Sequence, residues 1–367
     1  MNYAPAVIVH GGAGRRDPTQ EEAQRQGVRA AAALAWEHLR HGRSALEAVE
    51  LAVRLMEENP VFNCGVGSVL NWFGEVETDA SIMVSSGDAG AVGALQGVRH
   101  PISVARRVME ETDHLLLCGR GAELFARAVG FGPQVLETEE RRRAWERRRQ
   151  TILEGEPAEG APDEEHWRRL RAFHRRYLLE PGPAQESSCP PARAEAAMSQ
   201  VGAAAGGSPS GGSETSPRQP AGGEAGTVGV VALDQQGCIS AGTSTGGTML
   251  KLPGRVGDSA IIGAGTYASP AGGASATGHG EAIMRLMLAL RVVELQQQHV
   301  PAPNAAPLAL QAARQARGQC GVICVDRQGR LGRAFTTERM YTAGYTNLGE
   351  LPPERSAEGC VAEARGG

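Results

Sequence analysis

Apolar and polar residues recur along the first third of the chain with the periods of strands and helices. Ala6–Val9 is a short apolar run that ends at His10–Gly14, which predicts a strand followed by a tight glycine-rich turn. A 3.6-residue period predicts helices over Glu21–Leu39 and from Ser44 to Asn59, the second opened by a capping box. The same signals predict a strand over 76–83 and helices over 102–111 and 122–129.

The last third of the chain resumes these patterns after an interruption. Val228–Leu233 is apolar, residues 234–237 have turn composition, and residues 238–244 are again apolar or β-branched, which predicts a strand hairpin. A helix is expected from Gly280 to about Gln297, and a second hairpin over 321–336. Strands in both parts of the chain, with helices between them, predict a mixed α and β fold.

Two kinds of segment, which differ in composition, separate these two parts of the chain. Residues 139–149 and 163–179 are rich in arginine, and interleaved glutamate favours solvated helix faces over a site for acidic partners. Residues 180–225 consist mostly of Gly, Ser, Pro and Ala and bury too little apolar surface to offset the entropy of ordering, so we expect disorder. This tract stops abruptly at Gly226–Thr227, where the strand pattern begins.

The composition of the chain disfavours several classes of protein. The 367 residues are 41% hydrophobic and 21% charged, with a formal net charge of −4, so we expect no nucleic-acid partner. Without an apolar run of about 18 residues, we expect no membrane partner either. The seven cysteines contain no C-x-x-C pair, and the N-terminus reads as a strand and not as a signal peptide. Reduced thiols in the cytoplasm are therefore expected.

Several motifs occur in the same order as in a known protein family. They are GTVGVVALD at Gly226, TSTGG at Thr243, PGRVGDS at Pro253 and TGHGE at Thr277, together with VIVHGGAG, ENPVFNCGVGSVLN, VETDASIM and HPISVARRVMEET in the N-terminal part. Over roughly residues 6–135 and 226–345 the chain resembles the isoaspartyl peptidase/L-asparaginase family of N-terminal-nucleophile hydrolases. It departs from the family pattern at Ala225 and at Val84–Asp88, where Asp-Gly is usual.

The resemblance implies an α+β fold, a four-layer αββα sandwich forming one joint domain. Residues 1–226 would be the α subunit, ordered to about 179 and followed by a disordered linker over 180–226, and residues 227–367 the β subunit. The family suggests an αβ heterodimer made from one chain that dimerises to (αβ)2. The implied substrates are small molecules, L-asparagine and β-aspartyl dipeptides, and no organic cofactor is implied.

Thr227 is the candidate nucleophile. A threonine hydroxyl is weakly nucleophilic and needs a base, and an internal threonine has only an amide nitrogen beside it. Cleavage of the Gly226–Thr227 bond would free an α-amine with a pKa of about 7.7–8.0, partly neutral at pH 7. Gly226 favours this step because it lacks a Cβ and tolerates strained backbone. The plainer interpretation makes Thr227 the first residue of a strand.

The resemblance gives roles to five further residues. Thr245 would hydrogen-bond the nucleophile, and the hairpin returns it beside Thr227. Arg255 would bind the α-carboxylate of an amino-acid substrate and Asp258 its α-ammonium group. Thr277 and Gly278 would form the oxyanion hole. Ordinary structural roles compete with three of these assignments: a β-propensity threonine for Thr245 and a surface ion pair for Arg255 and Asp258.

Weaker candidates complete the site. Gly280 and Asn63 match substrate-binding positions, His279 reads as a structural histidine at a helix start, and the family loop at His10–Gly14 packs near the nucleophile without the spacing of a phosphate cradle. The loop over 56–66 resembles one whose backbone carbonyls hold a sodium ion. The carbonyls in question belong to Met56, Glu57, Asn59, Phe62, Cys64 and Val66.

Other functions stay open at the level of sequence. A glycosylasparaginase-like hydrolase would carry Asp before the nucleophile, TSTNG in place of TSTGG, and a secretory signal. A threonine endopeptidase similar to taspase is disfavoured by the same missing Asp. A non-processing relative acting as a binding or scaffold protein is motivated by the altered loop at Val84–Asp88 and by the arginine-rich segments.

Overall fold

The computed structural model describes residues 3–14, 17–154, 172, 226–315 and 318–352. Contacts divide the chain into two compact units, residues 1–150 with 219–367, and residues 151–218. The first unit contains both sheets and the helices that pack on them. The predicted disordered tract over 180–225 and nearly all of the arginine-rich segment over 163–179 lie outside the described residues.

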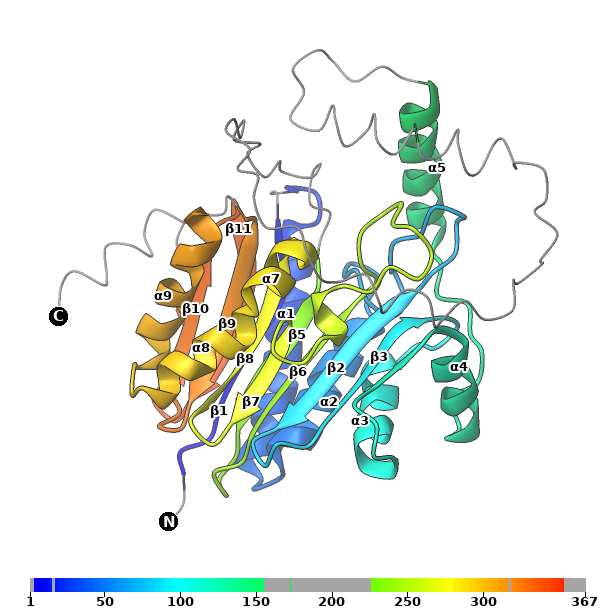
Figure 1. Cartoon of the computed structure of the whole chain (residues 1–367). Coiled ribbons are helices and arrows are strands. Elements are labelled where there is room, and N and C mark those ends of the chain that lie inside the picture. Colours follow the sequence, from blue (N-terminus) through cyan, green and yellow to red (C-terminus); the bar gives the residue numbers. More distant parts are fainter. Residues whose placement is uncertain (1–2, 15–16, 155–171, 173–225, 316–317, 353–367) are drawn as a thin grey trace, which may run out of the picture. The chain divides into compact units, whose positions relative to one another are not determined.

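Among the described residues, the larger of two sheets has eight strands in the order β12-β11-β1-β5-β6-β2-β3-β4 (Figure 1). Neighbours pair antiparallel except β3 and β4, which are parallel. The strand β5, which follows the Gly226–Thr227 junction, lies between β1 and β6 at the centre. The strands are β1 (Ala6–Gly14), β2 (Thr78–Val84), β3 (Ala89–Leu95), β4 (Leu116–Cys118), β5 (Val228–Leu233), β6 (Ile239–Thr245), β11 (Arg339–Thr346) and β12 (Gly349–Glu350).

The smaller sheet has four antiparallel strands in the order β10-β9-β8-β7. They are β7 (Thr266–Ser269), β8 (Gly272–Gly278), β9 (Cys320–Asp326) and β10 (Leu331–Phe335). Its strands β7, β8 and β9 contact β1, β5 and β6 of the larger sheet. The two sheets are therefore packed on each other, with β8 facing the central strands.

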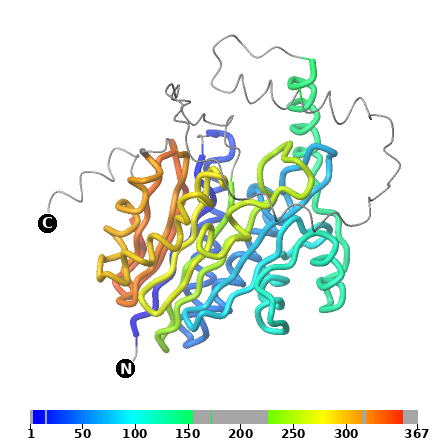
Figure 2. The backbone as a smooth tube through the Cα atoms, in the orientation of Figure 1, coloured from blue at the N-terminus to red at the C-terminus, as the bar shows by residue number. Residues whose placement is uncertain are grey.

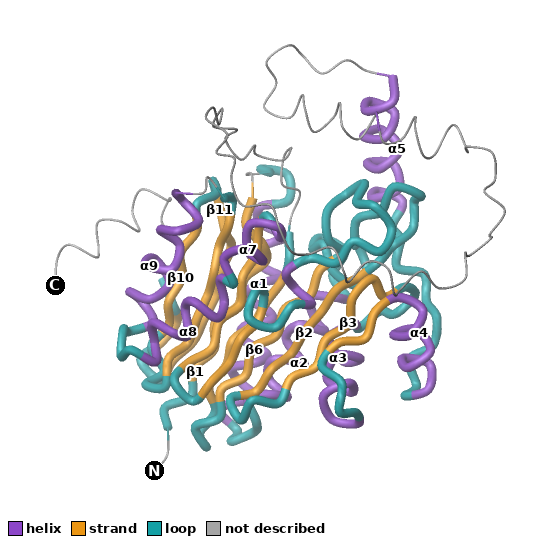
Figure 3. Tube along the Cα trace, viewed as in Figure 1, coloured by secondary structure: helices purple, strands orange, loops and turns teal. Residues whose placement is uncertain are grey.

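Helices pack on both sheets (Figure 3). The helices α1, α2 and α3 contact the larger sheet, and α8 and α9 contact the smaller one. The described helices are α1 (Glu21–Arg40), α2 (Ala45–Glu57), α3 (Pro101–Glu111), α4 (Gly119–Ala128), α5 (Glu139–Glu154), α7 (Gly280–Leu286), α8 (Leu288–Gln297) and α9 (Ala302–Gln315), with a 3-10 turn at Asp258–Ala260. The described residues thus form an α+β fold.

Three apolar clusters hold these elements together. One lies between α1–α3 and the larger sheet, a second between α7–α9 and the smaller sheet, and a third between the sheets. Val230 belongs to the first cluster and its neighbour Val231 to the third, because successive side chains of a strand point to opposite faces. Burial on both faces explains why β5 is a continuous apolar run.

Much of the predicted secondary structure is confirmed. The hairpins β5–β6 and β9–β10 and the helices α1 and α2 form where the sequence places them. The Ser44 hydroxyl accepts the Glu47 amide hydrogen at 3.2 Å, as the capping box requires. The sequence did not predict the strands β3, β4, β7, β8, β11 and β12 or the helix α9. Among these, β3, β8 and α9 are rich in glycine and alanine and have weak periodicity.

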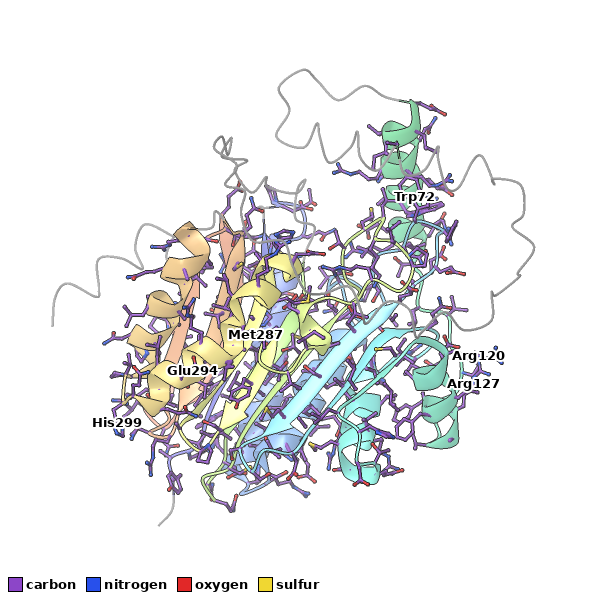
Figure 4. All side chains as sticks on the ribbon, viewed as in Figure 1. Trp72, Arg120, Arg127, Met287, Glu294 and His299 are labelled. Carbon is purple, nitrogen blue, oxygen red and sulfur yellow. The ribbon has the colours of Figure 1, made fainter. Side chains whose placement is uncertain are left out.

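Two predictions are wrong. The glycine-rich segment His10–Gly14 is not a turn but the end of β1, which continues beside β11 with a register shift between His10 and Ala13. The helix predicted from Gly280 to Gln297 breaks at Met287, which has left-handed dihedrals (φ 49°, ψ 53°). Met287 is labelled in Figure 4, and Figure 2 traces the backbone in the same orientation. The start of α8 instead donates the amide of Leu290 to the Gly263 carbonyl at 2.8 Å.

Candidate active site

Thr227 lies immediately before β5 and is 5% exposed. Val228 pairs with Ser244 in the antiparallel register of β5 and β6, so Thr227 and Thr245 lie at the same end of the hairpin. The Thr245 hydroxyl accepts the Gly247 amide hydrogen at 3.0 Å. The hairpin thus brings the two threonines to one place, and the predicted hydrogen bond between their hydroxyls stays a prediction.

Thr277, at the end of β8, reaches the junction from the other sheet. Its hydroxyl donates to the Thr227 carbonyl at 3.4 Å and accepts the Ala13 amide hydrogen at 3.2 Å. Gly278 has a φ of +127°, and a Cβ there would lie 2.2 Å from the Gln319 carbonyl oxygen. Only glycine fits at this position. Of the two predicted oxyanion residues, Thr277 therefore contacts the candidate nucleophile, and Gly278 follows it directly in the chain.

The bulge in β1 brings backbone against the junction itself. Gly12 has a φ of +101°, and a Cβ on it would lie 2.6 Å from the Gly226 nitrogen. The Gly12 amide donates to Nδ1 of His10 at 3.3 Å. The predicted proximity of this glycine-rich segment to the nucleophile is confirmed, with a bulged strand in place of the expected turn.

His10 is fully buried beneath the junction and was not predicted to have a role. Its Nε2 lies 3.0 Å from the Ser275 hydroxyl. Because Nδ1 accepts a hydrogen bond from Gly12, the proton of the neutral ring lies on Nε2. Burial lowers the pKa of His10 to about 3, opposed by a hydrogen bond to the Thr227 backbone, so the ring is neutral at pH 7.

A chain of buried hydroxyls continues from His10 across both sheets. The Ser275 hydroxyl lies 2.8 Å from that of Thr243, which accepts a hydrogen bond from Thr266 at 2.5 Å. Ser81 donates to the Thr266 hydroxyl at 2.8 Å. These side chains come from β8, β6, β7 and β2. The network links the two sheets below the Gly226–Thr227 junction. Because its buried polar groups serve as one another's hydrogen-bond partners, it favours one arrangement of the two sheets.

Arg255 and Asp258 meet at Gly280. A Cβ on Gly280 would lie 2.7 Å from Nη2 of Arg255 and 2.9 Å from Oδ1 of Asp258. Asp258 is 3% exposed, and its Oδ2 has no hydrogen-bond partner among the described residues. Burial raises the pKa of Asp258 to about 7, against the opposite influence of Arg255. The three predicted substrate-binding positions are therefore together, with one carboxylate oxygen unused.

Glu281 and His279 extend this cluster. Oε1 of Glu281 accepts hydrogen bonds from Nε and Nη2 of Arg255 at 3.1 and 2.9 Å, and Oε2 lies 3.1 Å from Nε2 of His279. His279 is the N-cap residue of α7, in agreement with its predicted place at a helix start. Glu281 closes the TGHGE motif, and no pattern in the sequence predicted a role for it.

Asn63 orders the turn that follows Thr245. Its Nδ2 donates to the Gly247 carbonyl at 2.7 Å, and its backbone carbonyl accepts the Gly246 amide hydrogen at 2.8 Å. A Cβ on Gly246 would lie 2.5 Å from Oδ1 of Asn63. Asn63 is thus close to the site through the backbone that it holds, and direct contact with substrate stays a prediction.

The carbonyls predicted to hold sodium are partly engaged. The Glu57 carbonyl accepts the Val66 amide hydrogen at 2.8 Å, and the Met56 and Asn59 carbonyls accept backbone amides at 3.1 Å. A carbonyl oxygen has a second lone pair, so these contacts are compatible with cation binding. No cluster of three His, Cys, Asp or Glu side chains suited to a metal occurs in the described part of the chain. Sodium binding remains a prediction.

The loop that departs from the family pattern is remote from the nucleophile along β2. Asp79 of β2 pairs with Thr245, whereas Val84 at the other end pairs with Ser240. The Val84 amide donates to the Asp88 carbonyl at 3.0 Å, closing the β2–β3 connection there. The departure at Val84–Asp88 therefore falls at the end of the strand away from Thr245.

Comparison with known proteins agrees with this geometry. A family model described as Asparaginase matches residues 3–350. The chain belongs to the asparaginase family. It is 41% identical over 353 residues to the protein named plant-type L-asparaginase of Pyrococcus furiosus, covering 95% of this chain and 98% of that protein. It is 36% identical over 343 residues to the isoaspartyl peptidase/L-asparaginase of Xenopus laevis, covering 92% and 90%.

Within this family the chain is an amidohydrolase. The rat protein named isoaspartyl peptidase/L-asparaginase is 36% identical over 351 residues, covering 95% of this chain and 88% of that protein. Among the described residues, no helix has both the length and the apolar character of a membrane span.

Gly229 tests the packing of the buried network. It pairs with His10 in β1, and a Cβ on it would lie 2.0 Å from the Ser275 hydroxyl and 2.4 Å from Nε2 of His10. Gly229→Ala should lower the free energy of unfolding by about 1–3 kcal/mol through overpacking. Chemical denaturation measures this.

The matched control is Gly121, a glycine of α4 with open space around its Cβ position. Gly121→Ala should raise stability by about 0.5–1 kcal/mol, because alanine favours helix. A Gly229→Ala variant as stable as the wild type would show that the network yields easily to an added methyl group.

Proposed function

We propose that the protein is an autoprocessing threonine amidohydrolase that hydrolyses L-asparagine to L-aspartate and ammonia and cleaves β-aspartyl dipeptides. The observation that carries the proposal is the position of Gly226–Thr227 at the start of the central strand, contacted by Thr277 and by the bulge at Gly12. The names of the relatives from Pyrococcus and Xenopus support both substrate classes.

The first reaction is cleavage of the chain. The Thr227 hydroxyl attacks the Gly226 carbonyl carbon, the acyl group passes from nitrogen to oxygen, and water hydrolyses the ester. The products are a carboxylate on Gly226 and a free amine on Thr227. The buried position of Thr227 and the close backbone of Gly12 support this step, because they restrict the scissile segment to few conformations.

The second reaction uses the amine created by the first. It accepts the proton of the Thr227 hydroxyl, which attacks the side-chain amide carbonyl of asparagine and releases ammonia. Water then hydrolyses the acyl-enzyme and releases aspartate. Thr277 and Gly278 stabilise the negative oxygen of each tetrahedral intermediate, and one such donor contributes about 3 kcal/mol.

Substrate selection falls to the Arg255–Asp258 pair. The guanidinium binds the α-carboxylate and Asp258 binds the α-ammonium group. The unused Oδ2 of Asp258 supports this role, because a buried carboxylate oxygen without a partner is costly unless a ligand supplies one. The absence of a Cβ on Gly280 supports the same role, because it lets the Arg255 and Asp258 side chains pack together against its backbone.

The proposal includes the architecture implied by the family. The three apolar clusters support a four-layer αββα sandwich of the N-terminal-nucleophile type. Cleavage would yield an α subunit ending at Gly226 and a β subunit starting at Thr227, and two αβ units would form (αβ)2. A sodium ion at the 56–66 loop belongs to the same proposal, with backbone carbonyls as ligands.

Variants of Thr227 test the function directly. Wild-type protein should contain a chain starting at Thr227, as intact-mass measurement would reveal, and should release ammonia from asparagine. Thr227→Ala should stay a single chain without activity, because it lacks the hydroxyl used in both reactions. Thr227→Ser should retain part of both. A wild-type protein that releases ammonia while remaining one uncut chain would rule out the amine as base.

Gly12 tests the restriction of the scissile segment. Gly12→Ala should slow cleavage on the order of 10–100-fold, because its Cβ would displace the Gly226 backbone. Gly87→Ala is the matched control: its φ is +106° and no atom lies within 4 Å of its Cβ position. Time courses by denaturing gel compare the two variants. Equal cleavage rates in the two variants would contradict the restriction of the scissile segment by Gly12.

The pKa of Asp258 predicts a pH dependence. With its pKa raised to about 7, the carboxyl group is ionised above pH 7 and protonated below it. Only the ionised form attracts the substrate ammonium, so its contribution to kcat/KM should fall by about tenfold per pH unit below 7. Asp258→Asn should have lower kcat/KM at pH 8 and should lose this limb of the pH profile. An unchanged profile would contradict the assignment.

A further inference from the structure

One face of the helix α5 holds a loop, residues 67–75, by its backbone carbonyls. Three side chains of the helix each donate a hydrogen bond to one carbonyl of the loop: Nε of Arg141 to Gly67 at 2.8 Å, Nε1 of Trp145 to Asn71 at 2.8 Å, and Nη2 of Arg142 to Gly74 at 2.9 Å. The guanidinium group of Arg149 also lies over the buried ring of Trp72, 5.7 Å from its centroid. The helix therefore fixes the loop along its length.

These contacts correct the interpretation of the arginine-rich segment 139–149. Its interleaved glutamates predicted solvated helix faces, and Arg143, which pairs with Glu139, agrees with this because its side chain is 65% exposed. Arg141, in contrast, is only 7% exposed. A buried guanidinium group needs acceptors for its donors, and a loop carbonyl supplies one. One face of α5 is thus solvated, and the other packs on the loop.

The same loop contacts the segment 250–255, which ends at Arg255. Two backbone hydrogen bonds join the loop to this segment, each 2.8 Å long: from the Leu250 amide to the Leu70 carbonyl, and from the Trp72 amide to the Lys251 carbonyl. The loop 67–75 therefore bonds to α5 and to the segment that contains the proposed carboxylate-binding residue.

The segment 250–255 belongs to no helix or strand, so its conformation depends on contacts with its neighbours. Besides the loop, Glu77 provides two of them. Its backbone carbonyl accepts a hydrogen bond from Nζ of Lys251 at 2.8 Å, and its carboxylate accepts the Gly254 amide hydrogen at 3.0 Å. A displacement of the loop would therefore remove part of what holds Arg255 in place.

We propose that Trp145 and Arg142 are positioning residues for substrate binding: they hold the loop 67–75, and the loop holds the segment 250–255 so that Arg255 is in place before the substrate arrives. The inference rests on the proposed function. Ordering a loosely held segment during binding costs conformational entropy, and contacts that order it beforehand remove part of that cost. Because α5 precedes the proposed cleavage site and Arg255 follows it, the α part of the chain stays necessary for substrate binding after cleavage.

Hydrogen exchange tests the physical link. Trp145→Phe keeps an aromatic ring and removes the Nε1 donor, and Arg142→Ala removes its hydrogen bond to the loop. In the purified full-length gene product, each variant should raise the exchange rates of the Leu250 and Trp72 amides by about fivefold, the effect expected for the loss of one hydrogen bond. Arg143→Ala is the matched control, because it removes an arginine from the solvated face of the same helix. It should leave both rates unchanged.

Binding and kinetics test the consequence for the site. In calorimetric titrations, Trp145→Phe and Arg142→Ala should each weaken binding of the product L-aspartate by about fivefold. In steady-state assays, each should raise KM for asparagine by about fivefold. The value of kcat per cleaved chain should stay within about 1.5-fold of wild type, because the chemistry at Thr227 is retained. A helix that only stabilised the fold would instead reduce the active fraction, and so lower kcat with KM unchanged.

The outcomes separate this inference from the proposed function. Unchanged exchange of the Leu250 and Trp72 amides, or unchanged aspartate affinity, in Trp145→Phe and Arg142→Ala would overturn the positioning role. Equal effects of Arg143→Ala, or a lower kcat with KM unchanged, would overturn it too. Wild-type protein that neither binds aspartate nor releases ammonia would overturn it together with the proposed function. Wild-type protein that binds aspartate with the expected dependence on α5, yet releases no ammonia from asparagine, would overturn the proposed function alone.

Discussion

The pairing of β5 with a strand on each side is the constraint on which the rest of the structure depends. Its backbone bonds to β1 and β6, and its side chains enter two apolar clusters, so no part of it is free to move alone. Thr227 precedes this strand directly. A peptide bond at such a place can break without loss of the fold, because the strand is held by its neighbours and not by the chain before it.

Hydrogen bonds on both faces of β6 fix the position of this strand within that apolar packing. Thr243 faces the space between the sheets, where it joins Ser275 and Thr266. Ser244 faces the helices and donates to the buried carboxyl of Glu57 at 2.7 Å. Burial raises the pKa of Glu57, while contacts with His100 and Ser244 oppose this. The strand that ends in Thr245 is therefore fixed from both sides by hydrogen bonds, which specify geometry better than apolar contact does.

The residues of the proposed site lie where these strands begin or end. Thr227, Thr245 and Thr277 come from the ends of β5, β6 and β8, and the bulge of β1 supplies the backbone of Gly12. Reactive positions on rigid strands are held more precisely than positions on loops. The proposed substrate-binding side is different in kind, because Arg255 lies in an irregular segment and is hydrogen-bonded to Glu281 in the first turn of α7.

Local signals in the sequence determined the strand start at Gly226–Thr227, the two hairpins and the Ser44 cap, whereas the candidate site residues came from the family resemblance. Each of these local signals depends on neighbours a few positions away: a period, a turn composition or a capping pair. Only the tertiary structure revealed the bulge of β1, the break at Met287, the hydrogen bond between His10 and Ser275 and the hydrogen bonds from Arg255 to Glu281. The partners in the last two cases are 265 and 26 residues apart. A local sequence pattern cannot predict such a contact. The two partners come together only when the chain has folded and its strands have paired and packed.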